Sequence, residues 1–247
     1  MFSLFRSKSN TLLADIIPAG YVDIHSHLLP KIDDGAKNID DTLFLITELK
    51  KLGFKKSITT PHVMGLVWEN TSGDILSNLN STQSIIEQNS PFTIKAAAEY
   101  MIDEQFVKLF KNDKLLTLKD NYVLIEMSYL NQPINLYEVI FDLQVAGYKP
   151  VLAHPERYNF FHTKTDEFFK LKKSGCFFQL NLLSTVGYYG ENVAKCADFL
   201  LKNNLIDFVG SDVHHSKHID SFYKKIVLKN ISILKDVIQN NSFFDFD

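Results

Sequence analysis

Hydrophobic residues along this chain fall into seven short runs, and longer segments with helical spacing of apolar positions separate them. Six of the seven runs end in a side chain that can bind a metal ion. The runs are Tyr21 to His27, Lys56 to His62, Thr93 to Glu99, Tyr122 to Glu126, Pro150 to His154, Cys176 to Asn181 and Ile206 to His214. Their length and their β-branched content predict buried strands.

Helix signals fill the gaps between the runs. Asn38 or Asp40 is a candidate N-cap for a helix whose apolar face carries Leu43, Ile46 and Leu49, and Gly53 is typical of a helix end. The remaining predicted helices begin at Thr71 or Ser72, at Asp103, at Asn135, at Thr163 or Thr165, at Gly190 and at Asp220. Their predicted ends are before Pro91, at Asn112, at Ala146, near Gly175, at Asn203 and at Asn240.

Strand and helix therefore alternate seven times, which favours a parallel sheet closed or nearly closed into a barrel. An open doubly wound sheet is the alternative, but it usually carries a glycine-rich phosphate-binding turn after an early strand. Neither G-x-G-x-x-G nor G-x-x-x-x-G-K occurs in the sequence. We expect one domain over residues 21–247, preceded by an N-terminal extension over residues 1–20.

Composition narrows the function classes. A length of 247 residues with 45% hydrophobic content suits one large α/β domain. The net charge of -3 gives no basic footprint for nucleic acid. Cys176 and Cys196 form no disulfide-like framework, and neither is followed six positions later by arginine, so a cysteine phosphatase loop is absent. No signal peptide or membrane-spanning run is evident, and we expect a cytoplasmic protein.

Two motifs at opposite ends of the series carry metal-binding chemistry. His25 and His27 are two residues apart, so on a strand they point to the same side and can bind one ion. Asp212 and His214 repeat this spacing with a carboxylate and an imidazole. In a parallel barrel the carboxyl ends of the strands meet at one face, so the two motifs would converge.

Further candidate ligands follow the other runs. Glu99 and Glu126 end apolar segments where an unpaired carboxylate is costly to bury, so each needs a cation or a basic partner. His62, His154 and the Asp33-Asp34-Gly35 turn complete the set. Salt bridges and structural histidines remain the alternatives for single members. Mixed imidazole and carboxylate ligands without thiolate favour manganese, iron or zinc.

Together these segments resemble a known family. The motifs HSH, TTPH, AAAEY, IEMS, LAHPERY and SDVHH, between Tyr21 and His218, are similar to the polymerase and histidinol phosphatase (PHP) family. The similarity is closest to its CpsB/YwqE-type bacterial tyrosine-protein phosphatases. This resemblance implies a distorted (β/α)7 TIM-like barrel of the PHP type.

The resemblance also implies three metal ions. His25, His27, Glu99 and Asp212 would hold the first, and Glu99 would bridge to a second. Glu126 and His154 would complete the second site. The third set would be Asp34, His62 and His214, with Asp33 as the alternative to Asp34.

The implied activity is hydrolysis of phosphotyrosine by metal-activated water, linked to the regulation of a capsule or exopolysaccharide tyrosine kinase. Arg157 matches the arginine of the family's HPER motif and would bind the phosphoryl group. The family often has a second arginine after the last motif, where this chain has Lys217 and His218 as candidate catalytic residues. The implied partner is a phosphotyrosyl protein, including a membrane tyrosine autokinase. A homo-oligomer is left open.

Other functions remain open on the sequence. A PHP enzyme of the same mechanism could act on histidinol phosphate or another small phosphate ester. An amidohydrolase-like barrel also begins with HxH, but it often uses a modified lysine, and no run here ends in an obvious lysine. A non-catalytic metal-containing binding module is the alternative of another class.

Overall fold

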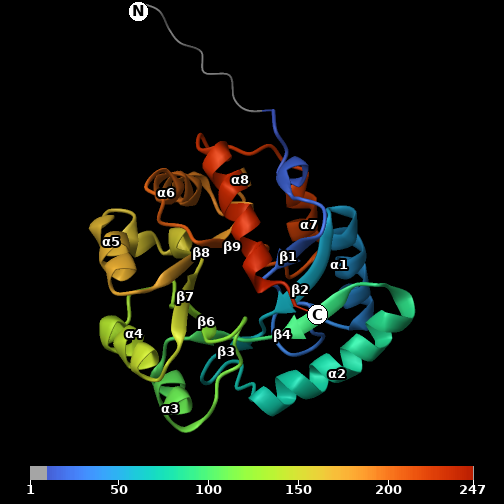
Figure 1. Cartoon of the computed structure of the whole chain (residues 1–247), viewed down its shortest axis with the longest axis horizontal. Helices are drawn as coiled ribbons and strands as arrows, with labels where there is room; N and C mark the ends of the chain where they lie inside the picture. The colour runs from blue at the N-terminus through green and yellow to red at the C-terminus, as the bar shows by residue number, and fades with distance from the viewer. Residues whose placement is uncertain (1–9, 247) are drawn as a thin grey trace, which may run out of the picture.

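The structure is a computed structural model that describes residues 10–246. The strands are β1 (Tyr21–Asp23), β2 (Phe54–Thr59), β3 (His62–Val63), β4 (Thr93–Ala96), β5 (Glu99–Met101), β6 (Tyr122–Glu126), β7 (Lys149–Ala153), β8 (Phe177–Asn181) and β9 (Phe208–Gly210). The α-helices are α1 (Ile39–Lys51), α2 (Ser72–Asn89), α3 (Glu104–Asn112), α4 (Leu136–Val145), α5 (Asp166–Lys173), α6 (Glu191–Lys202), α7 (Ser216–Phe222) and α8 (Ile231–Asn240). Most helices lie outside the strands (Figure 1). The predicted parallel α/β class is confirmed.

All strand pairs are parallel, and they form two sheets, β1-β2-β4 and β3-β5-β6-β7-β8-β9. Two of the predicted runs are each divided between the sheets. The second run is β2 and β3, interrupted at Pro61, which has no N–H to donate to a ladder. The third run is β4 and β5. Ala97 N donates to Thr59 O and Glu99 N donates to Pro61 O, so the two interrupted runs stay side by side across the break.

The first and last strands of the chain also lie next to each other (Figure 1). A parallel bridge joins Ser26 to Val213, and Asp212 N donates to His25 O over 2.7 Å. At the other end of these strands, the buried Asn241 side chain donates to Val22 O and Val209 O and accepts from Val209 N. Side chains and single bridges therefore hold β1 beside β9, where no named strand ladder does.

Local signals explain most helix positions. The Asn38 side chain accepts from Asp41 N and caps α1, whose buried face includes Leu45, Ile46 and Leu49. Thr71 and Asp74 form a reciprocal capping box at the start of α2. Asp103 caps α3 by accepting from Phe106 N. These caps confirm the predicted starts.

The single helix predicted over residues 220–240 is wrong, because the chain forms α7 and α8 with a loop between them. In that loop, Lys225 pairs with Leu12, and Ile226 N donates to Thr11 O. Backbone hydrogen bonding to the N-terminal segment therefore replaces the helix there. Part of the predicted extension, residues 1–9, lies outside the described residues, whereas Leu13 and Ile16 pack into the core.

Two apolar clusters form the core. The larger one lies between the strands and the surrounding helices, and the smaller one contains Val22, Ile58 and Leu124 from the strands and Ile24 just after β1. Phe244, near the C-terminus, is fully buried in the smaller cluster. The C-terminal segment thus covers the chain's own strands.

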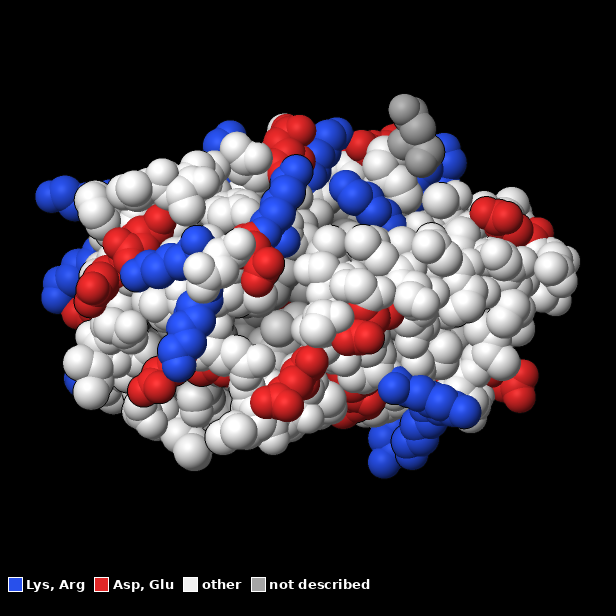
Figure 2. Space-filling model, turned by 90° about the horizontal axis from the view of Figure 1, so that it is seen from below, with Lys and Arg blue, Asp and Glu red and all other residues white. Residues whose placement is uncertain are grey.

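The charged surface shows no field of one sign on the face seen in Figure 2, where acidic and basic side chains are interspersed. This agrees with the small net charge of -3. Across residues 10–246, none of the helices combines the length and apolarity that a membrane crossing needs.

The side-chain hydrogen bonds by which Asn241 joins β1 to β9, which we call the Asn241 tie, can be tested by mutation. We expect Asn241→Ala to lower the free energy of unfolding by about 3 kcal/mol, because it leaves buried backbone groups of both strands without partners. Urea denaturation measures the change. Asn89→Ala, at an exposed helix end, is the control and should shift stability by less than about 0.5 kcal/mol. Equal effects of the two substitutions would contradict the tie.

Candidate metal centre

All nine sequence-predicted ligand residues lie in one cluster beside the strands. Most follow or end a strand, whereas His62 and Glu99 begin β3 and β5, because each run is interrupted just before them. The predicted position of these two at strand ends was therefore wrong. His154 and Asp212 adopt left-handed backbone conformations, with φ of 36° and 51°. Such strain in non-glycine residues is common at functional sites, where the surrounding structure maintains it.

Glu99 occupies the middle of the cluster and is completely buried. One carboxylate oxygen, Oε2, lies 3.2 Å from His25 Nε2, 3.5 Å from His27 Nε2 and 3.2 Å from His62 Nδ1. The other oxygen, Oε1, lies 3.0 Å from His154 Nε2. One carboxylate therefore faces four imidazoles on two sides.

Asp212 lies beside Glu99 against the same histidines. Its Oδ1 is 3.2 Å from His25 Nε2 and 3.4 Å from His27 Nε2. Its Oδ2 accepts from Arg157 and from Asn181 Nδ2, each over 2.8 Å. The side chain thus turns one oxygen to the cluster and the other to the residues around it.

A second side of the cluster is formed by Glu126 and His62. Glu126 Oε1 lies 2.9 Å from His62 Nδ1, which also faces Glu99. Burial raises the pKa of Glu126 to about 6, and the neighbouring negative charge of Glu99 acts in the same direction. The repulsion between these two carboxylates favours a cation between them.

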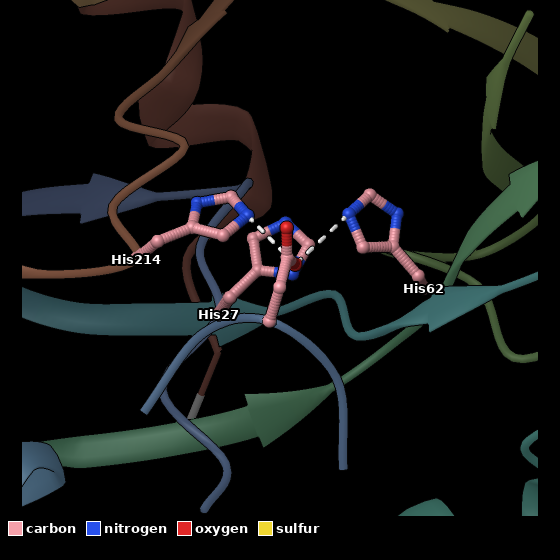
Figure 3. A group of neighbouring side chains, drawn as sticks. His27, His62 and His214 are labelled. Carbon is pink, nitrogen blue, oxygen red and sulfur yellow. Dashed lines mark ion pairs between the residues drawn. The ribbon is translucent and has the colours of Figure 1, made fainter. Parts of the chain in front are cut away.

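The third side is more open and contains Asp34. The rings of His27, His62 and His214 are turned toward a shared space (Figure 3). Asp34 Oδ1 lies 3.5 Å from His62 Nε2 and 3.3 Å from His214 Nε2.

The two carboxylates of the Asp33-Asp34 turn have different partners. Asp33 Oδ2 instead accepts from His27 Nδ1 over 2.7 Å, and Asp33 Oδ1 accepts from Gly35 N. In metal sites, a ligand histidine typically donates its second ring N–H to a carboxylate, which fixes the orientation of the ring.

These residues fit metal ions by two observations. First, the buried atoms His62 Nδ1, Glu126 Oε1 and Asp212 Oδ1 make ion-pair contacts but no hydrogen bond of acceptable geometry among residues 10–246. Second, potential ligand atoms gather within 4.8 Å of one another in four overlapping groups. The groups are His27, Asp34, His62 and His214; His25, His154 and Asp212; His25, His27 and Glu99; and His62, Glu99 and Glu126.

The histidine pKa values show how strongly the carboxylates act. Burial lowers the pKa of His25, yet Glu99 and Asp212 overcome this and raise it to about 10. At His154, burial together with the charge of Arg157 outweighs the opposing effect of Glu99 and Asp212 and lowers the pKa to about 4. The carboxylates therefore stabilise positive charge most strongly where His25, Glu99 and Asp212 meet.

Arg157 lies at the edge of the cluster and is held from several sides. Its guanidinium donates to Asp212 and lies over the rings of Tyr129, at 4.8 Å, and Tyr189, at 4.1 Å. Asn181 Nδ2 bonds the hydroxyl of Tyr189 over 3.1 Å. Arg157 is therefore fixed in place with part of its donor fork free to face a ligand.

The other two predicted catalytic residues lie differently. Lys217 is exposed on α7. His218 is buried, and its Nδ1 accepts from His214 N over 3.2 Å. Burial, helped by the charges of His214 and His215, lowers the pKa of His218 to about 3, so its ring is neutral.

Sequence reasoning missed Tyr129 and Glu156. Tyr129 OH lies 3.4 Å from His154 Nε2, and only tertiary contacts reveal this proximity. Tyr158, next to Arg157 in sequence, is fully buried, and its hydroxyl accepts from Met127 N. The buried side chain of Gln179 on β8 accepts from His25 Nδ1 over 2.8 Å.

Glu156 is a buried carboxyl group behind Arg157. Its Oε1 accepts from Asn181 N over 3.0 Å and from Ser184 Oγ over 2.7 Å, while Oε2 has no partner among residues 10–246. Burial raises its pKa to about 7. Glu156 thereby supports the segment that carries Asn181 toward Asp212 and Tyr189.

Clustered histidines and carboxylates at the strand ends of a parallel α/β fold, with a fixed arginine at the edge, are typical of metal-dependent hydrolases. Residues 21–225 match the family described as capsular polysaccharide synthesis, CpsB/CapC. The chain belongs to this family, and the resemblance to CpsB/YwqE-type proteins is confirmed.

Individual relatives agree. The tyrosine-protein phosphatase YwqE of Bacillus subtilis is 30% identical over 198 residues, covering 79% of this chain and 78% of YwqE. The tyrosine-protein phosphatase CpsB of Streptococcus agalactiae serotype V is 26% identical over 201 residues, covering 78% of this chain and 83% of CpsB. A solved structure from work on YwqE of Bacillus subtilis and CpsB of Streptococcus pneumoniae, described as unique metal-dependent tyrosine phosphatases, superposes with a TM-score of 0.78 at 26% identity over 90% of each chain.

A more distant structure shares the fold alone. The histidinol phosphate phosphatase of Lactococcus lactis, solved with zinc, L-histidinol and phosphate, gives a TM-score of 0.53 at 14% identity. It covers 93% of this chain and 95% of that chain.

The raised pKa of Glu156 predicts a pH-dependent stability difference. An unfolded glutamate ionises near pH 4.5 and the folded one near 7, so burial of the carboxylate increasingly destabilises the fold as pH rises through this range. Glu156→Gln keeps the acceptor oxygen and cannot ionise. Relative to the parent chain, this variant should gain about 3 kcal/mol between about pH 4.5 and pH 7, and no more above it. Urea midpoints across this range measure the difference, and a constant difference would contradict the assignment.

Proposed function

We propose that this chain is a metal-dependent protein-tyrosine phosphatase acting in capsule or exopolysaccharide synthesis. The observation that supports it most is the joining of Glu99 to four histidines, with Arg157 at the edge as the phosphate-binding group. Membership of the CpsB/CapC family and relatives named tyrosine-protein phosphatases support the same activity.

We assign three metal ions to the cluster, with manganese, iron or zinc as the candidates. His25, His27, Glu99 and Asp212 would hold the first, because Oε2 of Glu99 and Oδ1 of Asp212 face the same pair of rings. The proximity of Oε1 of Glu99 to His154 supports a second ion bridged by Glu99, with Glu126 and His154. Asp34, His62 and His214 would hold the third.

The fold proposal is a distorted barrel of seven β/α units. It treats β2 with β3, and β4 with β5, as two interrupted strands, which leaves seven strand positions. The Ser26 to Val213 bridge and the Asn241 tie support closure between the first and the last.

Metal ions supply positive charge to the phosphoryl oxygens and make water nucleophilic at neutral pH. The chain's own contribution is placement. Arg157 presents a planar donor fork to the phosphate oxygens, and its contacts with Asp212, Tyr129 and Tyr189 fix the direction of that fork. Tyr129 lies beside His154, with its hydroxyl 3.4 Å from Nε2 and its ring stacked on the imidazole.

On geometric grounds we assign Lys217 as the second phosphate-binding residue, in addition to Arg157. Lys217 is exposed, whereas Nδ1 of His218 is engaged by the backbone of the ligand segment and its ring is neutral. We therefore assign His218 to positioning of His214 and keep Lys217 as the cationic candidate. The proposed substrate is a phosphotyrosyl protein, including a membrane tyrosine autokinase.

Phosphate release from a phosphotyrosyl peptide tests this function. Chelator-stripped protein is assayed with and without added manganese, and a phosphoserine peptide and histidinol phosphate are parallel substrates. We expect release restored by manganese and selective for phosphotyrosine. Restored release on histidinol phosphate alone would overturn the substrate, and no release on any ester would favour a binding role.

Glu99→Ala tests the metal assignment. Removal of the shared carboxylate should reduce bound metal, measured by elemental analysis of dialysed protein, and lower kcat by at least about a thousandfold. Glu104→Ala, at an exposed position on α3, is the control and should keep both metal content and turnover. Normal metal content in the Glu99 variant would refute the bridging role.

A further inference from the structure

Two loops beside the metal cluster expose aliphatic side chains. Leu66 and Val67, with 95% and 58% of their surface exposed, form the first apolar lip, in the loop between β3 and α2. Leu130 and Ile134, with 88% and 105% exposed, form the second apolar lip, in the loop between β6 and α4. Water contact at large aliphatic side chains is unfavourable, so exposure on this scale beside a site suggests a binding surface.

Each lip is joined to the cluster through an aromatic ring. In the first loop, Trp68 stacks on His62 with ring centroids 4.8 Å apart and planes at 15°. In the second loop, Tyr129 stacks on His154 with centroids 5.7 Å apart and planes at 28°. His62 and His154 contact opposite oxygens of Glu99, so the two aromatic residues lie on either side of this carboxylate.

The first lip is held in a fixed shape. Met64 and Trp68 exchange two backbone hydrogen bonds, and Gly65 N donates to Asp103, the residue that caps α3. Leu66 has a φ of 64°, a left-handed conformation that is costly for leucine. The turn therefore presents a strained and exposed leucine whose side chain adds little to the stability of the fold.

We propose that the two apolar lips bind the aliphatic residues that flank phosphotyrosine in the protein substrate. This inference rests on the proposed phosphatase function and adds a substrate preference to it. The phosphotyrosyl ring enters between Trp68 and Tyr129, and its phosphate reaches the cluster and Arg157. The neighbouring side chains of the peptide then meet the first lip on one side and the second lip on the other.

The position of the lips argues for this occupant. Both loops follow strands that carry a site residue, His62 in β3 and Glu126 in β6, and both contact a site histidine through their own aromatic residue. A peptide whose phosphotyrosine reaches the cluster between these histidines would lie beside both loops. Contacts to phosphate alone do not distinguish one phosphotyrosyl protein from another, whereas aliphatic contacts at the lips do.

The test compares two phosphotyrosyl peptides with manganese-loaded protein. In one peptide, leucine and isoleucine flank the phosphotyrosine, and in the other, serine takes their places. p-Nitrophenyl phosphate is the third substrate, because it has no flanking residues. We expect the parent chain to prefer the aliphatic peptide by about tenfold in kcat/KM, mainly through KM.

Substitutions in each lip show which residues produce the preference for the aliphatic peptide. Leu66→Asn with Val67→Ser removes the first lip, and asparagine tolerates the left-handed backbone. Leu130→Ser with Ile134→Ser removes the second. Each pair should reduce the preference several-fold and leave p-nitrophenyl phosphate turnover unchanged, which also shows that the variant is folded. Val145→Ser, at a 72% exposed position near the end of α4, is the matched control and should keep the full preference.

The other outcomes separate the inference from the proposed function. Equal rates on the two peptides with normal turnover would overturn the inference alone. Loss of an oligomer in the lip variants, seen by light scattering, with peptide preference intact, would assign the lips to a second copy of the chain. Absence of release on every substrate would overturn the phosphatase function and this inference with it.

Discussion

The buried carboxylate of Glu99 is the constraint on which the rest of the site depends. It is completely shielded from water, and it lies close to Glu126 and to the group of histidines that also faces Asp212. Burying negative charge at this density is costly without cations, which protonated histidines or metal ions can supply here. The hydrogen bond between Asp33 and His27 and that between Gln179 and His25 set the ring orientations in advance.

Arg157 illustrates how a single charge is placed at the border between protein and solvent. Two tyrosine rings contact its planar group, and Asp212 binds one of its nitrogens. Behind it, Glu156 and Asn181 connect the loop after β7 with the end of β8. The arginine would therefore need little reorganisation to bind an anion, as the proposed phosphate-binding role requires.

Much of this could be predicted from sequence because runs of apolar residues mark strands, and parallel strands present their carboxyl ends on one side. That reasoning located His25, His154 and Asp212, although they are far apart along the chain. It failed for the helix over residues 220–240, since apolar spacing continues through Ile226, whose backbone pairs with the N-terminal segment. The contacts of Tyr129 and Glu156 could not be predicted either, because they depend on how separate loops pack.

The Asn241 tie has a consequence for how the chain folds. Val22 and Val209, which the Asn241 side chain joins, are separated by most of the chain, and Asn241 itself follows α8. Closing so long a loop is entropically costly, so contacts between these segments form slowly. His25 comes to lie beside Asp212 only when this closure is complete.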